Sequence, residues 1–200
     1  MQQFTNSTPD IHRLAKIVHK GGIVAYPTDT VYGLGCHPYM IDSVEKIFKL
    51  KIRENKPLPL LCDSLESALK IALFDKLSLK LAEEFWPGPL TILLPVKDNS
   101  LKSLTLGSEL IGLRVPNHRD SLFLISECGG YLVGTSANLS GSGSNHSASS
   151  VISQLPDIDA ILINDIEDDS KESTIVKVEN EEIIVLRSGS VDLELLQSIL

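Results

Sequence analysis

The stretch Tyr26-Pro27-Thr28-Asp29-Thr30-Val31-Tyr32-Gly33-Leu34-Gly35 joins a short apolar segment to a loop of hydroxyls and glycines. Residues 23–26 are apolar and rich in β-formers, and Pro27 ends them, which predicts a buried strand. A strand followed by a polar, glycine-bearing loop is a common place for ligands in α/β folds. On pattern alone two readings stay open. Either Thr28 and its neighbours bind a ligand, or Gly33 and Gly35 only shape a connecting loop.

Helical and strand patterns alternate along the rest of the chain. Helices are predicted after an Asp10 cap, after a capping box from Asp42 to Glu45, and over 64–72, 75–85 and 119–128, with another from 191. Further strands are predicted over 58–62, 90–96, 111–115, 131–135, 160–163, 174–178 and 183–186. The serine- and glycine-rich segment 136–150 is predicted to be a mobile loop. We predict one α/β (α+β) domain over residues 1–200, with a core at about 10–195 and a twisted mixed sheet flanked by helices.

The composition excludes several classes of protein. The net charge of -8 argues against a general nucleic-acid binder, and 42% hydrophobic with 22% charged residues is typical of a folded globular chain. Cys36, Cys62 and Cys128 form no Cys-x-x-Cys pair, so we expect no disulfide framework or structural zinc site, and a reducing cytoplasm fits. Cys36 and Cys128 are expected to be core or loop thiols rather than catalysts. No apolar run approaches the ~20 residues of a membrane helix. The sequence contains no P-loop, dinucleotide fingerprint, zinc-protease motif or nucleophile elbow.

A basic run stands out in this acidic chain: Lys46, Lys49, Lys51, Arg53 and Lys56. In extended backbone, Lys51 and Arg53 would point the same way, and an ammonium beside a guanidinium suits a polyphosphate. The alternative is a solvated helix end whose lysines favour the C-terminal dipole, and that alternative covers Lys46 and Lys49 better.

Two other groups of polar residues follow or interrupt apolar strands. The run Thr135-Ser136-Ala137-Asn138-Leu139-Ser140-Gly141 is dense in short hydrogen-bonding groups, and it reads equally as a ligand loop or as a polar turn. Arg114 lies inside the apolar strand predicted at 111–115, so it needs an anionic partner from the protein or from a ligand. Ser173 and Arg187 lie at the ends of late strands.

Taken in order, these segments resemble the YrdC family, the threonylcarbamoyl-AMP synthases. The resemblance spans residues 10–195 and rests on Tyr26 to Gly35, Lys51-Ile52-Arg53 with Lys56-Pro57-Leu58, Trp86-Pro87-Gly88-Pro89-Leu90-Thr91, Gly112-Leu113-Arg114-Val115-Pro116 with His118, Thr135 to Gly141, Glu172-Ser173-Thr174-Ile175-Val176 and Leu186-Arg187-Ser188-Gly189. The sequence departs from the family pattern at Glu54, at Leu61 with Cys62, and at Ser188.

The resemblance implies a fold around a large basic cavity and a reaction that joins L-threonine, bicarbonate and ATP into threonylcarbamoyl-AMP and pyrophosphate. Mg²⁺ would arrive with the ATP, and a partner transferase would pass the group to the tRNA adenosine beside the anticodon. The family's threonine contacts carry over to Thr28, Arg114, Thr135 and Ser173. Its ATP contacts carry over to Lys51, Arg53, Ser136, Asn138, Ser144 and Arg187.

Three alternatives remain open on the sequence. The first is a module that binds double-stranded RNA or tRNA in the same basic cleft, which the net charge disfavours. A second is a paralogue that keeps the fold without synthase activity. The last is a carbamoyl-adenylate domain of the kind found in hydrogenase-maturation proteins. The chain is expected to be the short, single-domain form of the family, without a second C-terminal domain.

Overall fold

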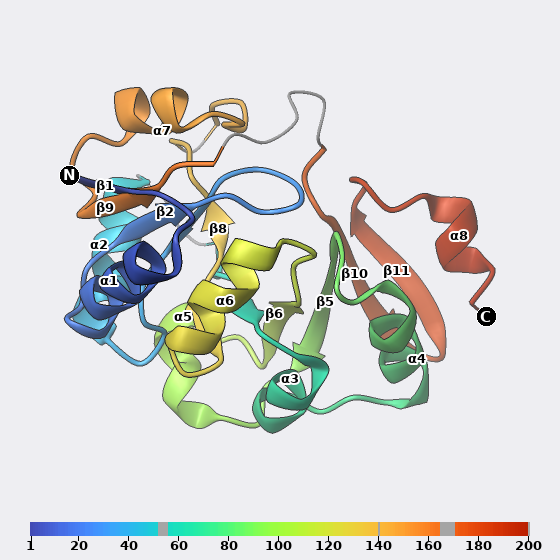
Figure 1. The fold of residues 1–200 in the computed structure, drawn as a ribbon. Coiled ribbons are helices and arrows are strands. Elements are labelled where there is room, and N and C mark those ends of the chain that lie inside the picture. Colours follow the sequence, from blue (N-terminus) through green and yellow to red (C-terminus); the bar gives the residue numbers. More distant parts are fainter. Residues whose placement is uncertain (52–55, 140, 165–170, 200) are drawn as a thin grey trace.

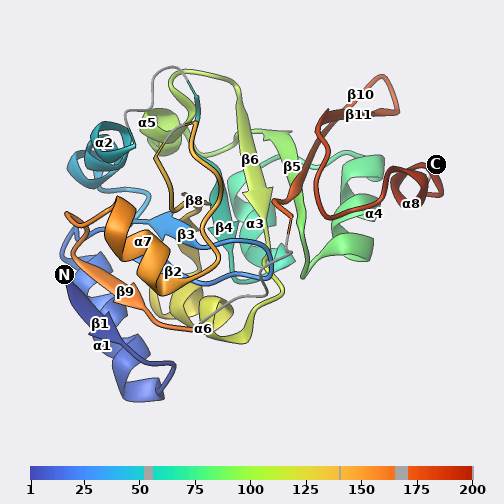
Figure 2. The same cartoon turned by 90° about the horizontal axis from the view of Figure 1, so that it is seen from above.

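Two β-sheets form the centre of the molecule, and helices lie around them (Figures 1 and 2). The computed structural model describes residues 1–51, 56–139, 141–164 and 171–199. The first sheet has the spatial order β1 (Gln2–Phe4), β9 (Ala160–Leu162), β2 (Val24–Tyr26), β3 (Gly33–Gly35) and β8 (Thr135–Ser136). The second sheet has the order β11 (Glu182–Arg187), β10 (Thr174–Glu179), β5 (Leu90–Pro95), β6 (Leu110–Arg114), β4 (Leu60–Cys62) and β7 (Tyr131–Val133).

Both sheets mix parallel and antiparallel neighbours, so the predicted α/β class with mixed strands is confirmed. In the first sheet β2 pairs in parallel with β9 and antiparallel with β3. In the second sheet β5 pairs in parallel with β10 and antiparallel with β6. The sequence indicated one sheet, however, and the structure has two.

The step between the sheets occurs at Gly134. The single strand predicted over 131–135 is split there: β7 pairs with β4, and β8 pairs with β3. A Cβ atom at residue 134 would lie 2.3 Å from the Cγ atom of Leu61, and the Gly134 amide donates to the Pro59 carbonyl at 3.0 Å. Only glycine lets the backbone pass this close to Leu61, and the chain crosses here from one sheet to the other.

Eight α-helices and one 3-10 turn occur among the described residues: α1 (Thr8–His19), α2 (Ile41–Leu50), α3 (Leu65–Ile71), α4 (Lys76–Phe85), η1 (Asn99–Leu101), α5 (Lys102–Thr105), α6 (Arg119–Glu127), α7 (Ala148–Gln154) and α8 (Leu193–Gln197). Helix α7 begins inside the segment predicted to be a loop through residue 150, because Ser147 caps it by accepting from the Ser150 amide at 3.3 Å. None of the described helices is long and apolar enough to cross a membrane.

Two predicted helix starts are wrong. Helix α1 begins at Thr8, and Asp10 lies in its first turn, where it accepts from the Thr5 amide at 3.0 Å. Helix α2 begins at Ile41 after Met40, which makes no side-chain cap. The hydroxyl of Ser43 is buried against the Gly21 carbonyl at 2.8 Å instead, so packing between distant segments fixes this helix start rather than a local capping box.

The core has two parts. One lies between the first sheet and the pair α1 and α6, where Leu14, Val18, Leu124 and Ile125 are fully buried. The other fills the space around both sheets and the remaining helices. Each leucine or isoleucine buried in this way contributes about 1.5–3 kcal/mol of transfer free energy. The face of α1 predicted from its apolar spacing, with Leu14 and Val18, is the face that packs.

The stretch from Tyr26 to Gly35 contains the end of β2, the loop that follows it and all of β3, and the two strands form a hairpin. The Tyr26 ring lies against both glycines of β3, since a Cβ atom at Gly33 or at Gly35 would come within 2.9 Å of ring carbons. The Tyr26 hydroxyl donates to the Val133 carbonyl at 2.7 Å, which ties this hairpin to β7 of the other sheet. The two glycines therefore serve close packing, and they fix the position of the loop between the strands.

Candidate functional site

A cavity of about 400 Å³ opens between the two sheets. The first sheet contributes the loop between β2 and β3 and strand β8, and the second sheet contributes β5, β6, β10 and β11. Its polar lining includes Thr28, Thr30, Lys56, Thr91, Ser108, Arg114, Thr135, Ser136, Glu172, Ser173 and Arg187. Its apolar lining includes Leu61, Leu93, Ile175 and Leu186. The described lining thus includes three basic side chains and one carboxylate.

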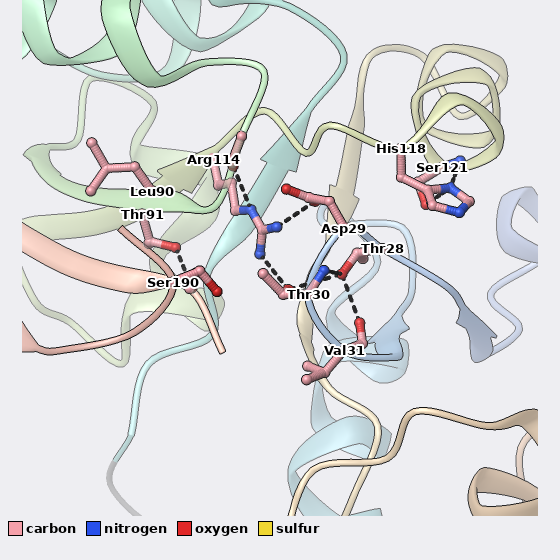
Figure 3. Close-up of polar contacts among 12 residues, drawn as sticks. Thr28, Asp29, Thr30, Val31, Leu90, Thr91, Arg114, His118, Ser121 and Ser190 are labelled. Carbon is pink, nitrogen blue, oxygen red and sulfur yellow. Dashed lines mark hydrogen bonds and ion pairs between the residues drawn. The ribbon is translucent and has the colours of Figure 1, made fainter. Parts of the chain in front are cut away.

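Arg114 lies at the junction between the sheets. Its Nε donates to the Gly88 carbonyl at 2.9 Å, Nη1 donates to the Thr30 hydroxyl at 3.0 Å, and Nη2 pairs with Asp29. Figure 3 shows the guanidinium pointing toward Asp29 and Thr30, both on the loop of the other sheet. Burial lowers the pKa of this guanidinium, and the Asp29 carboxylate acts in the opposite direction.

The loop around Asp29 is also held from the helix side. The Ser121 hydroxyl of α6 donates to the Pro27 carbonyl, and His118 caps α6 by accepting from the Ser121 amide at Nδ1, 3.3 Å away. Burial lowers the pKa of His118, while Asp120 and Asp29 raise it. The sequence indicated no role for His118. In the structure it is the N-cap residue of α6.

Hydrogen bonds inside the loop fix Thr28. Its hydroxyl donates to the Val31 carbonyl at 2.7 Å and accepts from the Thr30 amide at 3.1 Å. Thr28 is 4% exposed and lines the cavity. The loop is therefore a rigid turn whose shape the threonine hydroxyls set, and it presents those hydroxyls beside Arg114.

The segment after β8 is held from behind by Lys51. The ammonium donates to the Ser136 carbonyl, to the Asn138 carbonyl at 2.8 Å and to the Asn138 side-chain oxygen at 3.2 Å. Asn138 in turn donates to the Ser142 carbonyl at 2.6 Å. Lys51 is 1% exposed. Its charge is thus buried under the segment that carries Ser136.

The predicted extended backbone at Lys51 is wrong. Lys51 ends α2 in a helical conformation, with φ −84° and ψ −6°. Arg53 lies outside the described residues, as does Glu54, so the predicted pairing of Lys51 with Arg53 stays a prediction.

Arg187 and Ser173 lie together in the cavity lining. Arg187 donates from Nε and Nη2 to the Ser173 carbonyl at 3.1 and 2.8 Å, and from Nη2 to the Ser173 hydroxyl at 3.0 Å. Ser173 also contacts the Thr91 hydroxyl at 3.0 Å, so β10, β11 and β5 share one polar cluster. Glu172 pairs with Nη1 of Arg187 and accepts from the Ser144 hydroxyl at 2.6 Å.

All three cysteines are buried and free, so of the two predicted places for Cys36 and Cys128, core or loop, the structure shows buried positions. Burial raises the pKa of Cys36 and of Cys128 to about 12, and it raises the pKa of Cys62 as well. Thiols that stay protonated are poor nucleophiles and poor metal ligands. Within the described part of the chain, no group of three or more His, Cys, Asp or Glu residues is placed to hold a metal ion.

Comparison with known proteins identifies the family. The family model described as Sua5_yciO_yrdC, Telomere recombination, matches residues 16–189. The chain belongs to the Sua5/YciO/YrdC family. The resemblance deduced from the ordered motifs is therefore confirmed.

Three relatives of this Sua5/YciO/YrdC chain are similar to it over nearly its whole length. The threonylcarbamoyl-AMP synthase of Bacillus subtilis (strain 168) is 31% identical over 202 residues, which cover 99% of this chain and 58% of that protein. P. abyssi Sua5 complexed with L-threonine is 30% identical with a TM-score of 0.93, covering 99% of this chain and 60% of that one. E. coli YciO is 25% identical with a TM-score of 0.88, covering 96% and 98%. The chain spans about three fifths of the length of the first two.

The structure brings most of the predicted site residues of this Sua5/YciO/YrdC chain to one cavity. Six of them line it: Thr28, Arg114, Thr135, Ser136, Ser173 and Arg187. Lys51 and Asn138 lie behind the lining and hold Ser136, and Ser144 reaches the cavity edge through Glu172. Their roles toward ligands remain predictions.

Sequence reasoning missed three contributors to the site. Asp29 is the anionic partner that the buried Arg114 was expected to need, but a separation of 85 residues hid the pairing. Gly88 offers its carbonyl to Arg114 because the Trp86 indole donates to the Leu90 carbonyl at 2.7 Å and holds the turn between them. Glu172 begins the stretch Glu172 to Val176, and its charge directly before Ser173 was the available signal.

Proposed function

We propose that this chain forms threonylcarbamoyl-AMP and pyrophosphate from L-threonine, bicarbonate and ATP, as a nucleotidyltransferase. One observation carries the proposal: the four residues expected to hold threonine, Thr28, Arg114, Thr135 and Ser173, all line the same cavity. The names of two relatives that cover nearly all of this chain support it, one a threonylcarbamoyl-AMP synthase and the other a Sua5 complexed with L-threonine.

Arg114 would bind the carboxylate of threonine. A guanidinium has five N–H groups, and three of those on Arg114 bond to described residues of the protein. The remaining N–H groups can donate to a carboxylate in the cavity, a charge-assisted contact that is strengthened by burial. Thr28 and Thr135, each 4% exposed, would supply hydroxyl contacts from the opposite sheet.

The triphosphate would lie toward Arg187, Ser136 and Ser144. Lys51 and Asn138 hold the segment that carries Ser136, and Arg53 is expected to add a charge at the phosphates. Mg²⁺ bound to ATP supplies charge neutralisation at the phosphate oxygens. We expect the magnesium to come with the nucleotide, because Mg²⁺ is usually bound through substrate phosphates with few protein ligands.

The chemistry needs no protein nucleophile. Bicarbonate takes up a proton and loses water to give carbon dioxide. The threonine amine adds to this carbon dioxide, loses a proton and becomes a carbamate. A carbamate oxygen then forms a bond to the α-phosphorus of ATP while the bond from that phosphorus to pyrophosphate breaks. Such a transfer depends on alignment and on positive charge near the phosphates. Arg187 would supply charge at the phosphates, and Arg114 would hold the threonine whose carbamate attacks. The mixed anhydride would pass to a transferase that modifies the tRNA adenosine beside the anticodon.

Omission of single substrates tests the proposal. Pyrophosphate release from ATP is expected to require both threonine and bicarbonate, because only the carbamate attacks the α-phosphorus. We expect the release to fall to background when either compound is left out, as measured by a coupled phosphate assay with pyrophosphatase. Equal release in the absence of threonine would contradict the proposed function.

A further inference from the structure

Glu172 places a carboxylate at the point where Arg187 and Ser144 converge. One carboxylate oxygen accepts from the Ser144 hydroxyl at 2.6 Å, and the other pairs with Nη1 of Arg187. The side chains of Arg187 and Glu172 are 40% and 33% exposed, and both residues line the cavity, so a ligand can reach them. The only carboxylate in the described lining thus sits on two groups that we expect to hold ATP.

Arg187 does not depend on Glu172 for its orientation. The guanidinium donates from Nε and from Nη2 to the carbonyl of Ser173, and from Nη2 to the Ser173 hydroxyl. Three hydrogen bonds therefore hold its plane, and Nη1 alone faces Glu172. If Glu172 only positioned the Arg187 guanidinium, it would duplicate contacts that Ser173 already makes.

The backbone of Glu172 packs against the turn at Gly189, while its side chain contacts Ser144 and Arg187. Its carbonyl accepts from the Ser190 amide at 2.9 Å, and a Cβ atom at Gly189 would lie 2.2 Å from the same oxygen. Rotation of the Glu172 side chain would release Ser144 and Nη1 of Arg187 together.

We propose that Glu172 is an internal competitor of the nucleotide phosphates for Arg187. A phosphate oxygen is an acceptor of the same kind as a carboxylate oxygen, and two anions at one guanidinium repel each other. The phosphate must therefore displace Glu172, and the site binds polyphosphate more weakly than Arg187 and Ser144 alone would. This inference rests on the proposed function only for the identity of the phosphate as part of ATP.

Glu172→Gln tests the competition directly. Glutamine keeps the size of the side chain and an acceptor for Ser144 but removes the charge. The dissociation constant for inorganic pyrophosphate, measured by calorimetry without magnesium, is expected to fall about tenfold, since one like charge near the ligand is removed. In the double variant Glu172→Gln with Arg187→Ala, the gain is expected to disappear.

Glu179→Gln is the matched control. Glu179 ends β10, the strand that follows Glu172 in the chain, and it pairs with Lys177 at 2.9 Å, on the surface and outside the cavity lining. Its substitution is expected to leave pyrophosphate affinity unchanged. Unchanged or weaker binding in Glu172→Gln would overturn the inference, and so would a lack of pyrophosphate binding in every variant. Pyrophosphate binding needs no threonine chemistry. A tenfold gain in Glu172→Gln, together with no synthase turnover in the unsubstituted protein, would therefore support the inference while refuting the proposed function.

Discussion

Replacement of Arg114 by alanine is expected to abolish threonine-dependent pyrophosphate release and to lower the free energy of unfolding by about 3–5 kcal/mol. The guanidinium joins the two sheets through Gly88, Thr30 and Asp29. Its removal leaves Asp29, whose side chain is 13% exposed, as a buried charge without its ion-pair partner. It also removes the group that we expect to bind the substrate carboxylate. Urea unfolding and the pyrophosphate assay measure the two effects.

A double variant separates stability from activity. In Arg114→Met with Asp29→Asn, no unpaired charge is buried, so much of the lost stability is expected to return while pyrophosphate release stays at background. Arg13→Ala serves as a control, because Arg13 forms an exposed ion pair with Asp10 at 3.2 Å. Pairs of this kind contribute about 0–1 kcal/mol. Normal turnover in Arg114→Ala would contradict the role of this residue.

Replacement of Lys51 by methionine is expected to reduce pyrophosphate release at least roughly a hundredfold, because the segment that carries Ser136 loses its support. The Lys51 ammonium donates to the Ser136 carbonyl and to both oxygens of Asn138, and methionine offers none of these donors. Hydrogen bonds made by a charged donor such as this ammonium contribute about 1.5–3 kcal/mol each to stability. The midpoint of thermal unfolding is therefore expected to fall together with activity.

Lys49→Met is the control on the same helix. Lys49 is exposed, and its ammonium lies 4.0 Å from the Glu45 carboxylate, so it makes only a weak surface pair. We expect wild-type stability and turnover in this variant. A Lys51→Met protein that keeps wild-type turnover would show that neither phosphate binding nor the support of Ser136 depends on this ammonium.

The sequence was sufficient to predict what local patterns and ordered motifs encode. The apolar face of α1, the strand that ends at Tyr26 and the family itself follow from spacing and from the order of the motifs. Arg114 could be identified as a buried cation that needs a partner, because its neighbours in the strand are apolar.

Contacts between residues far apart in the sequence could not be predicted from those patterns. Nothing in the periodicity of residues 131–135 indicates that Gly134 divides two sheets, because the reason is the nearby Leu61 side chain of another strand. Asp29 meets Arg114 only after the sheets are placed, and the burial of Lys51 depends on the path of the segment after β8. Local propensity describes one element at a time, whereas these contacts join elements far apart in the sequence.

Isotopic analysis of the product tests the central claim most directly. The protein would be incubated with ATP, magnesium, L-threonine and ¹³C-bicarbonate, and the mixture analysed by mass spectrometry. We expect the mass of threonylcarbamoyl-AMP, shifted by one unit relative to unlabelled bicarbonate, together with an equal amount of pyrophosphate. The appearance of pyrophosphate without a labelled adenylate, or of an adenylate that carries no ¹³C, would contradict the proposed reaction.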